Sequence, residues 1–319
     1  MPDYSGTVEG DFPGGLRLDR YVAEEIKLLT RSQLKTKLLQ ARLNGKLVKL
    51  SRPVKPGDLL ELSWAESEPL DLIPENIPLE LLYEDDRVIV LNKAQGMVVH
   101  PGAGNHSGTL ANALLYRRLT RPGSSVPGAA IPGNLRPGIV HRLDKDTSGV
   151  IIAAWDDAAL AFLADQFKAR TVKKTYIALV QGTPKETQGV IETRIVRDSR
   201  DRKRFTVSFD KGKAALTRYR VIRSWGAWSL LLLQPKTGRT HQIRVHLRHL
   251  GHPILGDPIY GAPVLPTKFP ADKRFPGVTL MLHARTLSIT LPGMAEPSIF
   301  KAPLPERFRE IIRKAATGK

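Results

Sequence analysis

The most informative pattern of apolar and polar positions lies in residues 139–154. The apolar pair Ile139-Val140 leads into a polar segment with one histidine, two cations and two carboxylates, and Thr147-Ser148-Gly149 then leads into a second apolar run. This pattern predicts a charged loop between two buried strands, and rigid strands can hold reactive side chains in place. The alternative is that Arg142 and Lys145 only neutralise the neighbouring carboxylates.

The pattern in residues 16–64 predicts two helices and a small sheet. Apolar residues at helical spacing indicate a first helix from Leu18 onward and a second one that runs from Thr30, a suitable N-cap, to Leu39. Asn44-Gly45 is a hairpin-turn signal, and strand-like runs lie on either side of a second turn further on.

Composition along the chain sets the expected domain boundaries. Residues 1–15 have little apolar content and are expected to be a flexible N-terminus. Residues 65–78 are acidic and rich in proline, so we expect them to link the N-terminal module, residues 16–64, to a second domain, residues 79–319. Proline, glycine and small residues indicate long loops at 121–137 and 261–277.

One predicted helix of the second domain has a cationic face. Thr240 suits its N-cap and Gly251 its C-terminal stop. Ile243 would lie on the buried stripe, with His241 and Arg244 on the opposite face. Other strand patterns lie at 79–93, 173–180, 219–222 and 228–233, and other helical patterns at 109–119, 156–168 and 305–315.

Charge indicates the kind of partner. The 319 residues include 49 Lys and Arg against 31 Asp and Glu, which gives a net charge of +18 and favours a polyanion, nucleic acid before an anionic membrane. No apolar run approaches the roughly 20 residues that a spanning helix needs, and the N-terminus lacks a secretory signal pattern. The absence of cysteine excludes disulfides and thiol chemistry and fits a cytoplasmic protein.

Cofactor and metal signatures are also missing from the sequence. No glycine-rich dinucleotide motif and no Walker-type Gly-Lys-Ser/Thr occurs, so we expect no nucleotide cofactor. His246 and His249 have a spacing that a metal could use, but among nearby acids only Asp257 could join them, and no metal site is expected. The remaining chemistry is that of a carboxylate among cations, Asp144 or Asp146, which would suit a nucleophile or an electrostatic partner at a sugar carbon.

Four blocks resemble the RluA family of RNA pseudouridine synthases. His141-Arg142-Leu143-Asp144-x-x-Thr147-Ser148-Gly149, with Arg136-Pro137-Gly138 before it, resembles the catalytic motif of that family. Asn92-Lys93-x-x-Gly96-x-x-Val99-His100-Pro101 resembles its first motif, Lys174-Thr175-Tyr176 its tyrosine segment, and the text from Gly238 to Gly261 its last motif. The blocks follow the family order. The resemblance implies an α+β fold in which a mixed, mainly antiparallel sheet has flanking helices, and a reaction without a cofactor.

The resemblance also implies roles for the matched residues. Asp144 would be the essential carboxylate, attacking either the sugar or the base, and Arg142 would fill the space of the flipped uridine. Tyr176 would stack on the base, and Arg244 would pair with Asp144, with Arg239 as the competitor for that pairing. Asp146 is expected to be dispensable, and His141 and Arg239 are grouped with the residues that contact RNA.

The N-terminal module has its own resemblance. No acid interrupts its cations between residues 28 and 55, which favours a phosphate-binding face over a merely solvated one. Residues 16–64 resemble the αL-type RNA-binding module of a small-subunit ribosomal protein and of bacterial tyrosyl-tRNA synthetases, in blocks such as Arg17-Leu18-Asp19-Arg20-Tyr21 and Val54-Lys55-Pro56-Gly57-Asp58. Expected RNA contacts are Arg31, Lys35, Arg42 and Lys46.

These resemblances lead to one functional prediction with two alternatives. The predicted function is a monomeric enzyme that isomerises uridines to pseudouridine in structured RNA, with large-subunit ribosomal RNA as the first choice. One alternative is the same chemistry on transfer RNA. The other is an RNA-binding ribosome-assembly factor without catalytic activity.

Overall fold

The computed structural model describes residues 3–29, 31–65, 72–102, 104–121, 138–261 and 278–317. The chain divides into two compact units, Met1–Asp71 and Leu72–Lys319, and this division falls within the range that the sequence predicts as a linker. Thr30 and the two predicted long loops, apart from their end residues Arg121 and Gly261, lie outside the described residues.

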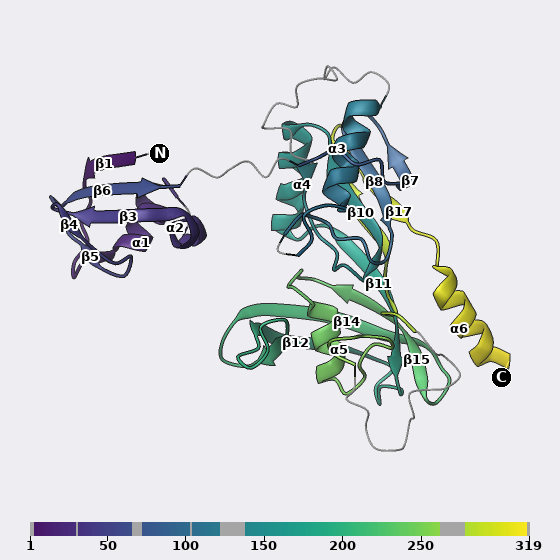
Figure 1. The fold of residues 1–319 in the computed structure, drawn as a ribbon. Helices are drawn as coiled ribbons and strands as arrows, with labels where there is room; N and C mark the ends of the chain where they lie inside the picture. Colours follow the sequence, from purple (N-terminus) through teal and green to yellow (C-terminus); the bar gives the residue numbers. More distant parts are fainter. Residues whose placement is uncertain are drawn as a thin grey trace. The chain divides into compact units, whose positions relative to one another are not determined.

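The N-terminal unit is built around an antiparallel sheet of four strands in the order β1-β6-β3-β4 (Figure 1). Asn44 and Gly45, with φ of 51° and 74°, connect β3 to β4, as the hairpin signal predicts. The elements of this unit are β1 (Asp3–Thr7), β2 (Leu16–Arg17), α1 (Leu18–Arg20), a π-helical turn (Tyr21–Glu25), α2 (Arg31–Lys37), β3 (Leu38–Leu43), β4 (Lys46–Leu47), β5 (Pro53–Val54) and β6 (Leu59–Trp64).

Two expectations for this unit are wrong. The expected flexible N-terminus contains β1, because the backbone of Asp3–Thr7 pairs with β6 and needs few apolar side chains to do so. The second helix ends at Lys37 rather than Leu39, because β3 begins at Leu38, which pairs with Trp64 across the sheet. In both segments strand pairing prevails over the local pattern.

The second unit contains an 11-stranded sheet whose main path has the order β13-β12-β14-β15-β11-β16-β10-β8-β7. Its pairs are antiparallel except for β10 with β16, which confirms the predicted mixed, mainly antiparallel sheet. The strands are β7 (Glu80–Glu84), β8 (Val88–Lys93), β9 (Gly138–Ile139), β10 (Ser148–Ala154), β11 (Lys173–Gln181), β12 (Gln188–Arg197), β13 (Phe205–Ser208), β14 (Lys213–Ser224), β15 (Trp228–Pro235), β16 (Leu282–Thr290) and β17 (Pro297–Lys301).

Helices cover both faces of the sheet where β8 and β10 lie. Alternate residues of these strands face opposite ways, so Leu91 packs in a cluster with Leu114 of α3 (Leu110–Thr120). Val90 packs in a different cluster with Leu163 of α4 (Asp157–Ala169). Both strands are therefore buried on their two faces and keep a fixed place for the loop that enters β10.

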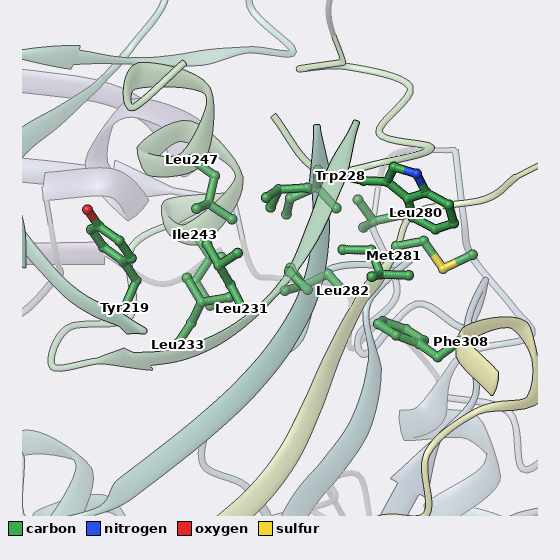
Figure 2. Close-up of a cluster of buried hydrophobic side chains, with 14 of the residues drawn as sticks. Tyr219, Trp228, Leu231, Leu233, Ile243, Leu247, Leu280, Met281, Leu282 and Phe308 are labelled. Carbon is green, nitrogen blue, oxygen red and sulfur yellow. The ribbon is translucent and has the colours of Figure 1, made fainter. Parts of the chain in front are cut away.

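Two more helices pack on the other part of the sheet (Figure 1). Figure 2 shows Ile243 and Leu247 of α5 (Gln242–His249) lying near Leu231 and Leu233 of β15 in one apolar cluster. Phe308 of α6 (Glu306–Thr317) belongs to the same cluster, and the sequence predicts both helices within a few residues of their ends. Within the described ranges, no helix has the combination of length and apolar character that crossing a membrane requires.

Candidate active site

A cavity of about 430 Å³ lies where the loop before β10, strand β11 and the start of α5 meet. This volume is within the range of small-molecule binding pockets. Asp144 is the one carboxylate among the described residues that line it, whereas cations are numerous, and the pocket therefore favours an anionic ligand. The lining cations are Arg142, Lys168, Arg170, Lys174, Lys236, Arg239 and Arg244.

Residues 93–96 hold the loop that carries Asp144 in place through hydrogen bonds. The ammonium of Lys93 is buried and donates to the carbonyl oxygens of Ala94, Met97 and Lys145 at 2.8, 2.8 and 3.1 Å. Gly96 N also donates to Lys145 O, and the Gln95 amide donates to Asp146 O. Burial lowers the pKa of Lys93 to about 7, while the negative charges of Asp144 and Asp146 act in the opposite direction.

Gly149 lets the loop return into the sheet. Its φ is +120°, and a Cβ at this position would lie 2.1 Å from the carbonyl oxygen of Ala284 in β16. Only glycine can bring β10 this close to β16 at the point where the two strands pair in parallel. The expected return of the chain at Thr147-Ser148-Gly149 is therefore confirmed.

Arg244 joins two carboxylates at the floor of the pocket. Its Nη1 lies 3.4 Å from Asp144 Oδ2, while its Nε and Nη2 donate to the two oxygens of Asp257 at 2.8 Å each. The side chains of Arg244, Asp257 and Asp144 are 3%, 0% and 19% exposed, so the buried Arg244–Asp257 pair presents a guanidinium edge to a partly accessible Asp144. A cation in this position stabilises the charged carboxylate and orients it.

The structure also answers which arginine pairs with Asp144. The Nε of Arg239 donates a hydrogen bond to the carbonyl oxygen of Ala214 at 3.0 Å. Arg244, and not Arg239, therefore forms the ion pair with Asp144. Arg244 lies on α5, which begins at Gln242 with His241 at the N-cap position, in left-handed backbone conformation (φ 55°). The expected N-cap at Thr240 is therefore wrong, because His241 is held in this conformation by tertiary contacts.

Tyr176 lies in β11 and lines the same pocket. The register of β11 against β16 shifts between Thr175 and Tyr176, and such an irregularity redirects a side chain relative to a regular strand. Burial, together with the negative charge of Asp144, raises the pKa of the Tyr176 phenol. The phenol therefore stays protonated beside the carboxylate at neutral pH.

The remaining residues of the predicted catalytic motif have different environments. Arg142 is exposed at the pocket and free to meet a ligand that enters. His141 stacks on Phe167, its Nε2 accepts a hydrogen bond from Ile152 N, and burial lowers its pKa to about 3. Its ring thus packs as a neutral part of the pocket wall, which does not favour the expected RNA contact.

The expected RNA contacts of the N-terminal unit are partly accessible. Arg42 and Lys46 are exposed. Arg31 is also exposed but forms an ion pair with the buried Asp19 at 2.8 Å, and the side chain of Lys35 lies outside the described residues. A hollow of this unit is lined by the cations Lys46, Lys49, Arg52 and Lys55.

Sequence reasoning missed three residues that shape the site. Asp257 was weighed only as a metal ligand, whereas it holds Arg244 and accepts hydrogen bonds from Ile259 N and Tyr260 N. Tyr260 packs against the Arg244 guanidinium, and Lys93 holds the loop. All three lie in the blocks that carry the family resemblance, which is the signal that could have found them.

His246, which the sequence offers as a metal ligand, has a structural role instead. Both of its ring nitrogens form hydrogen bonds with threonine hydroxyls in the core.

The comparisons with known proteins agree with this geometry. Residues 87–249 match a family model described as RNA pseudouridylate synthase. A Ribosomal large subunit pseudouridine synthase D of Borreliella burgdorferi is 44% identical over 92% of this chain and 87% of its own length. The chain belongs to the RluA-type family of RNA pseudouridine synthases.

Two further relatives support this membership. An uncharacterized RNA pseudouridine synthase of Chloroflexus aurantiacus is 44% identical over 93% of this chain and 89% of its own length. The solved structure of human RNA Pseudouridylate Synthase Domain Containing 4 is 28% identical, covers 74% of this chain and 93% of that one, and has a TM-score of 0.57. The protein is thus an RNA pseudouridine synthase, an isomerase that acts on RNA.

Proposed function

We propose that this pseudouridine synthase modifies uridines of large-subunit ribosomal RNA, and that Asp144 is its essential carboxylate. One observation carries the assignment: Asp144 is the one carboxylate among the described residues of a pocket whose other charged residues are cations, and the buried Arg244 contacts it directly. The cations suit a polyanionic substrate, and the oriented carboxylate suits attack at an electron-poor carbon.

The pocket residues divide the reaction between them. The N1–C1′ bond breaks, the uracil turns, and a C5–C1′ bond forms, so that N1 gains a proton and C5 loses one. Asp144 takes part as the attacking carboxylate, and the protonated Tyr176 stacks on the base within the pocket. Arg142, exposed at the rim, occupies the place of the extruded uridine and offsets part of the few kcal/mol that unstacking a base costs.

The large-subunit target has its support in the relatives and in charge. The Borreliella burgdorferi relative is named for the large ribosomal subunit. The N-terminal unit adds a second cationic surface, the hollow lined by Lys46, Lys49, Arg52 and Lys55, which suits a folded RNA with many phosphates. Membership in an enzyme family counts against the alternative of a non-catalytic assembly factor.

The test is to map pseudouridine in transcribed large-subunit ribosomal RNA and in a pool of transcribed transfer RNAs after incubation with the protein. Modification of discrete uridines in the ribosomal RNA is the expected result. Modification of transfer RNA alone would establish the alternative substrate. Modification of neither RNA by the wild-type protein would contradict the proposal.

A further inference from the structure

His241 lies at the pocket in a fixed conformation, but it has no role in the attack by Asp144 or in base flipping as proposed so far. Its left-handed backbone (φ 55°) is uncommon for a residue with a side chain and requires support from its surroundings. The support comes from two aromatic rings that meet the imidazole edge-on, Phe205 with a centroid distance of 5.7 Å and Tyr260 with 5.4 Å. The side chain lines the same cavity as Asp144.

The hydrogen bonds of Tyr260 determine where the imidazole carries its proton. Phe205 N donates to the Tyr260 hydroxyl oxygen at 2.8 Å, and His241 Nδ1 lies 2.8 Å from the same oxygen. Tyr260 is buried. Within the described part of the chain, His241 Nδ1 is the acceptor within reach of the Tyr260 hydroxyl hydrogen. Because a buried hydroxyl needs an acceptor, Nδ1 accepts, and the hydrogen of the imidazole is on Nε2.

The charge around His241 agrees with a neutral ring. Burial lowers its pKa, and the nearby cations Arg244 and Arg142 act in the same direction, while Asp144 and Asp257 oppose them. A protonated ring would also donate from Nδ1 and leave the Tyr260 hydroxyl hydrogen without its acceptor. In the described residues, Nε2 has no protein hydrogen-bond partner, so its N–H is available to a ligand in the cavity.

We propose that His241 donates its Nε2–H to a carbonyl oxygen of the target uracil and stabilises the negative charge that the ring acquires when the N1–C1′ bond breaks. That bond leaves its electron pair on the uracil, where it spreads over N1 and the carbonyl oxygens. The proton stays on His241 throughout, so the step needs no other reactant. The inference rests on the proposed function, since it requires uridine in this pocket.

Tyr260 is then the positioning residue of this arrangement. Its hydroxyl fixes the proton of His241, and its ring lies under the Arg244 guanidinium at 5.1 Å. A fixed, uncharged donor suits this place because it is already oriented when charge develops, and losing one such donor costs about 10²–10³ in kcat. The same residue thus orients the carboxylate side and the uracil side of the pocket.

The experiment compares single-turnover rates on RNA that carries tritium at C5 of uridine, because isomerisation releases this atom. His241→Asn suits the left-handed backbone but is too short to place an N–H where Nε2 lies, and we expect a rate about 10²-fold lower. His241→Gln can place an amide N–H there, and we expect it to recover most of the loss. His249→Asn, on the exposed end of the same helix and outside the cavity, should behave as wild type.

Tyr260→Phe tests the positioning role. It should lower the rate of the wild-type protein, but it should change little in the His241→Gln background, whose amide has no tautomer to fix. RNA affinity and thermal unfolding, measured for every variant, should stay near wild-type values for the His241 changes. Equal rates for His241→Asn and wild type, or an equal decrease in rate for the Asn and Gln variants, would overturn the inference. The proposed function would still stand in either case, because it depends on the activity of the wild-type protein.

Discussion

The buried pair Arg244–Asp257 permits a quantitative prediction for Asp257→Asn. The substitution removes one charge from a pair whose side chains are 3% and 0% exposed and leaves two guanidinium donors facing a neutral amide. Removing one partner of a buried pair costs about 3–5 kcal/mol of the free energy of unfolding. Two unit charges 4 Å apart at an effective dielectric constant of 20 attract by about 4 kcal/mol, which is the same size.

Asp144 offsets part of this loss, because it remains 3.4 Å from Arg244 and can receive the freed guanidinium. We therefore expect a loss near the lower end of that range, and at least a tenfold lower rate of pseudouridine formation, since Arg244 no longer holds a fixed position. Urea unfolding measures the first quantity and tritium release the second. The double variant Arg244→Met/Asp257→Leu should recover stability without activity, because it removes both charges.

The pH dependence of this stability loss follows from the pKa of Asp257. Burial by itself would raise that pKa, but the hydrogen bonds and the charge of Arg244 lower it below the ordinary value of 3.8. The contribution of the charged carboxylate is therefore fully present above the ordinary value and is lost as the pH falls through the lowered one. The difference between wild type and Asp257→Asn should be constant near neutral pH and shrink below about pH 4. A difference under about 1 kcal/mol at neutral pH, with wild-type activity, would refute the assigned role of the pair.

Three further predictions concern other parts of the molecule. Lys93→Met removes the ammonium that donates to three carbonyl oxygens, and we expect it to lower the reaction rate much more than RNA affinity. Equal effects in rate and binding measurements would count against a role of Lys93 in holding the loop. Gly149→Ala should prevent folding of the second unit or strongly lower its melting temperature. Gly226→Ala, with φ of +77° and open space at its Cβ, should lower the free energy of unfolding by only about 1–2 kcal/mol. Similar melting temperatures for the two variants would contradict the close approach of β10 and β16. The cations of the hollow in the N-terminal unit can be replaced by Gln at Lys46, Lys49, Arg52 and Lys55. We expect weaker RNA binding with a smaller salt dependence, and Arg20→Gln serves as the control. An unchanged salt slope would exclude this hollow from RNA contact.

Much of the site could be predicted from local sequence because it lies in a loop between two strands. The apolar runs around residues 141–147 indicate the loop, and the blocks that resemble the RluA family identify Asp144 within it. Tyr176 and Arg244 are 32 and 100 positions away in the sequence, so only the resemblance, and no spacing rule, joins them to Asp144. The structure brings all three to one cavity.

The features that the sequence did not reveal depend on tertiary contacts. The pairing of Asp257 with Arg244 depends on how the chain folds back after α5, and local patterns do not carry that information. The conformation of His241 is likewise set by Phe205 and Tyr260, which lie in other segments. Strand β1 was missed because backbone pairing with β6, rather than an apolar pattern, holds it.

The most direct test of the role of Asp144 compares Asp144→Asn with Asp146→Asn. Both changes remove one carboxylate from the same loop, but only Asp144 lines the cavity and contacts Arg244. On large-subunit ribosomal RNA labelled with tritium at C5, we expect Asp144→Asn to lower the single-turnover rate by roughly 10⁴-fold or more. Asp146→Asn should stay close to wild type. A folded Asp144→Asn variant that releases tritium as fast as wild type would contradict the role of Asp144 as the essential carboxylate.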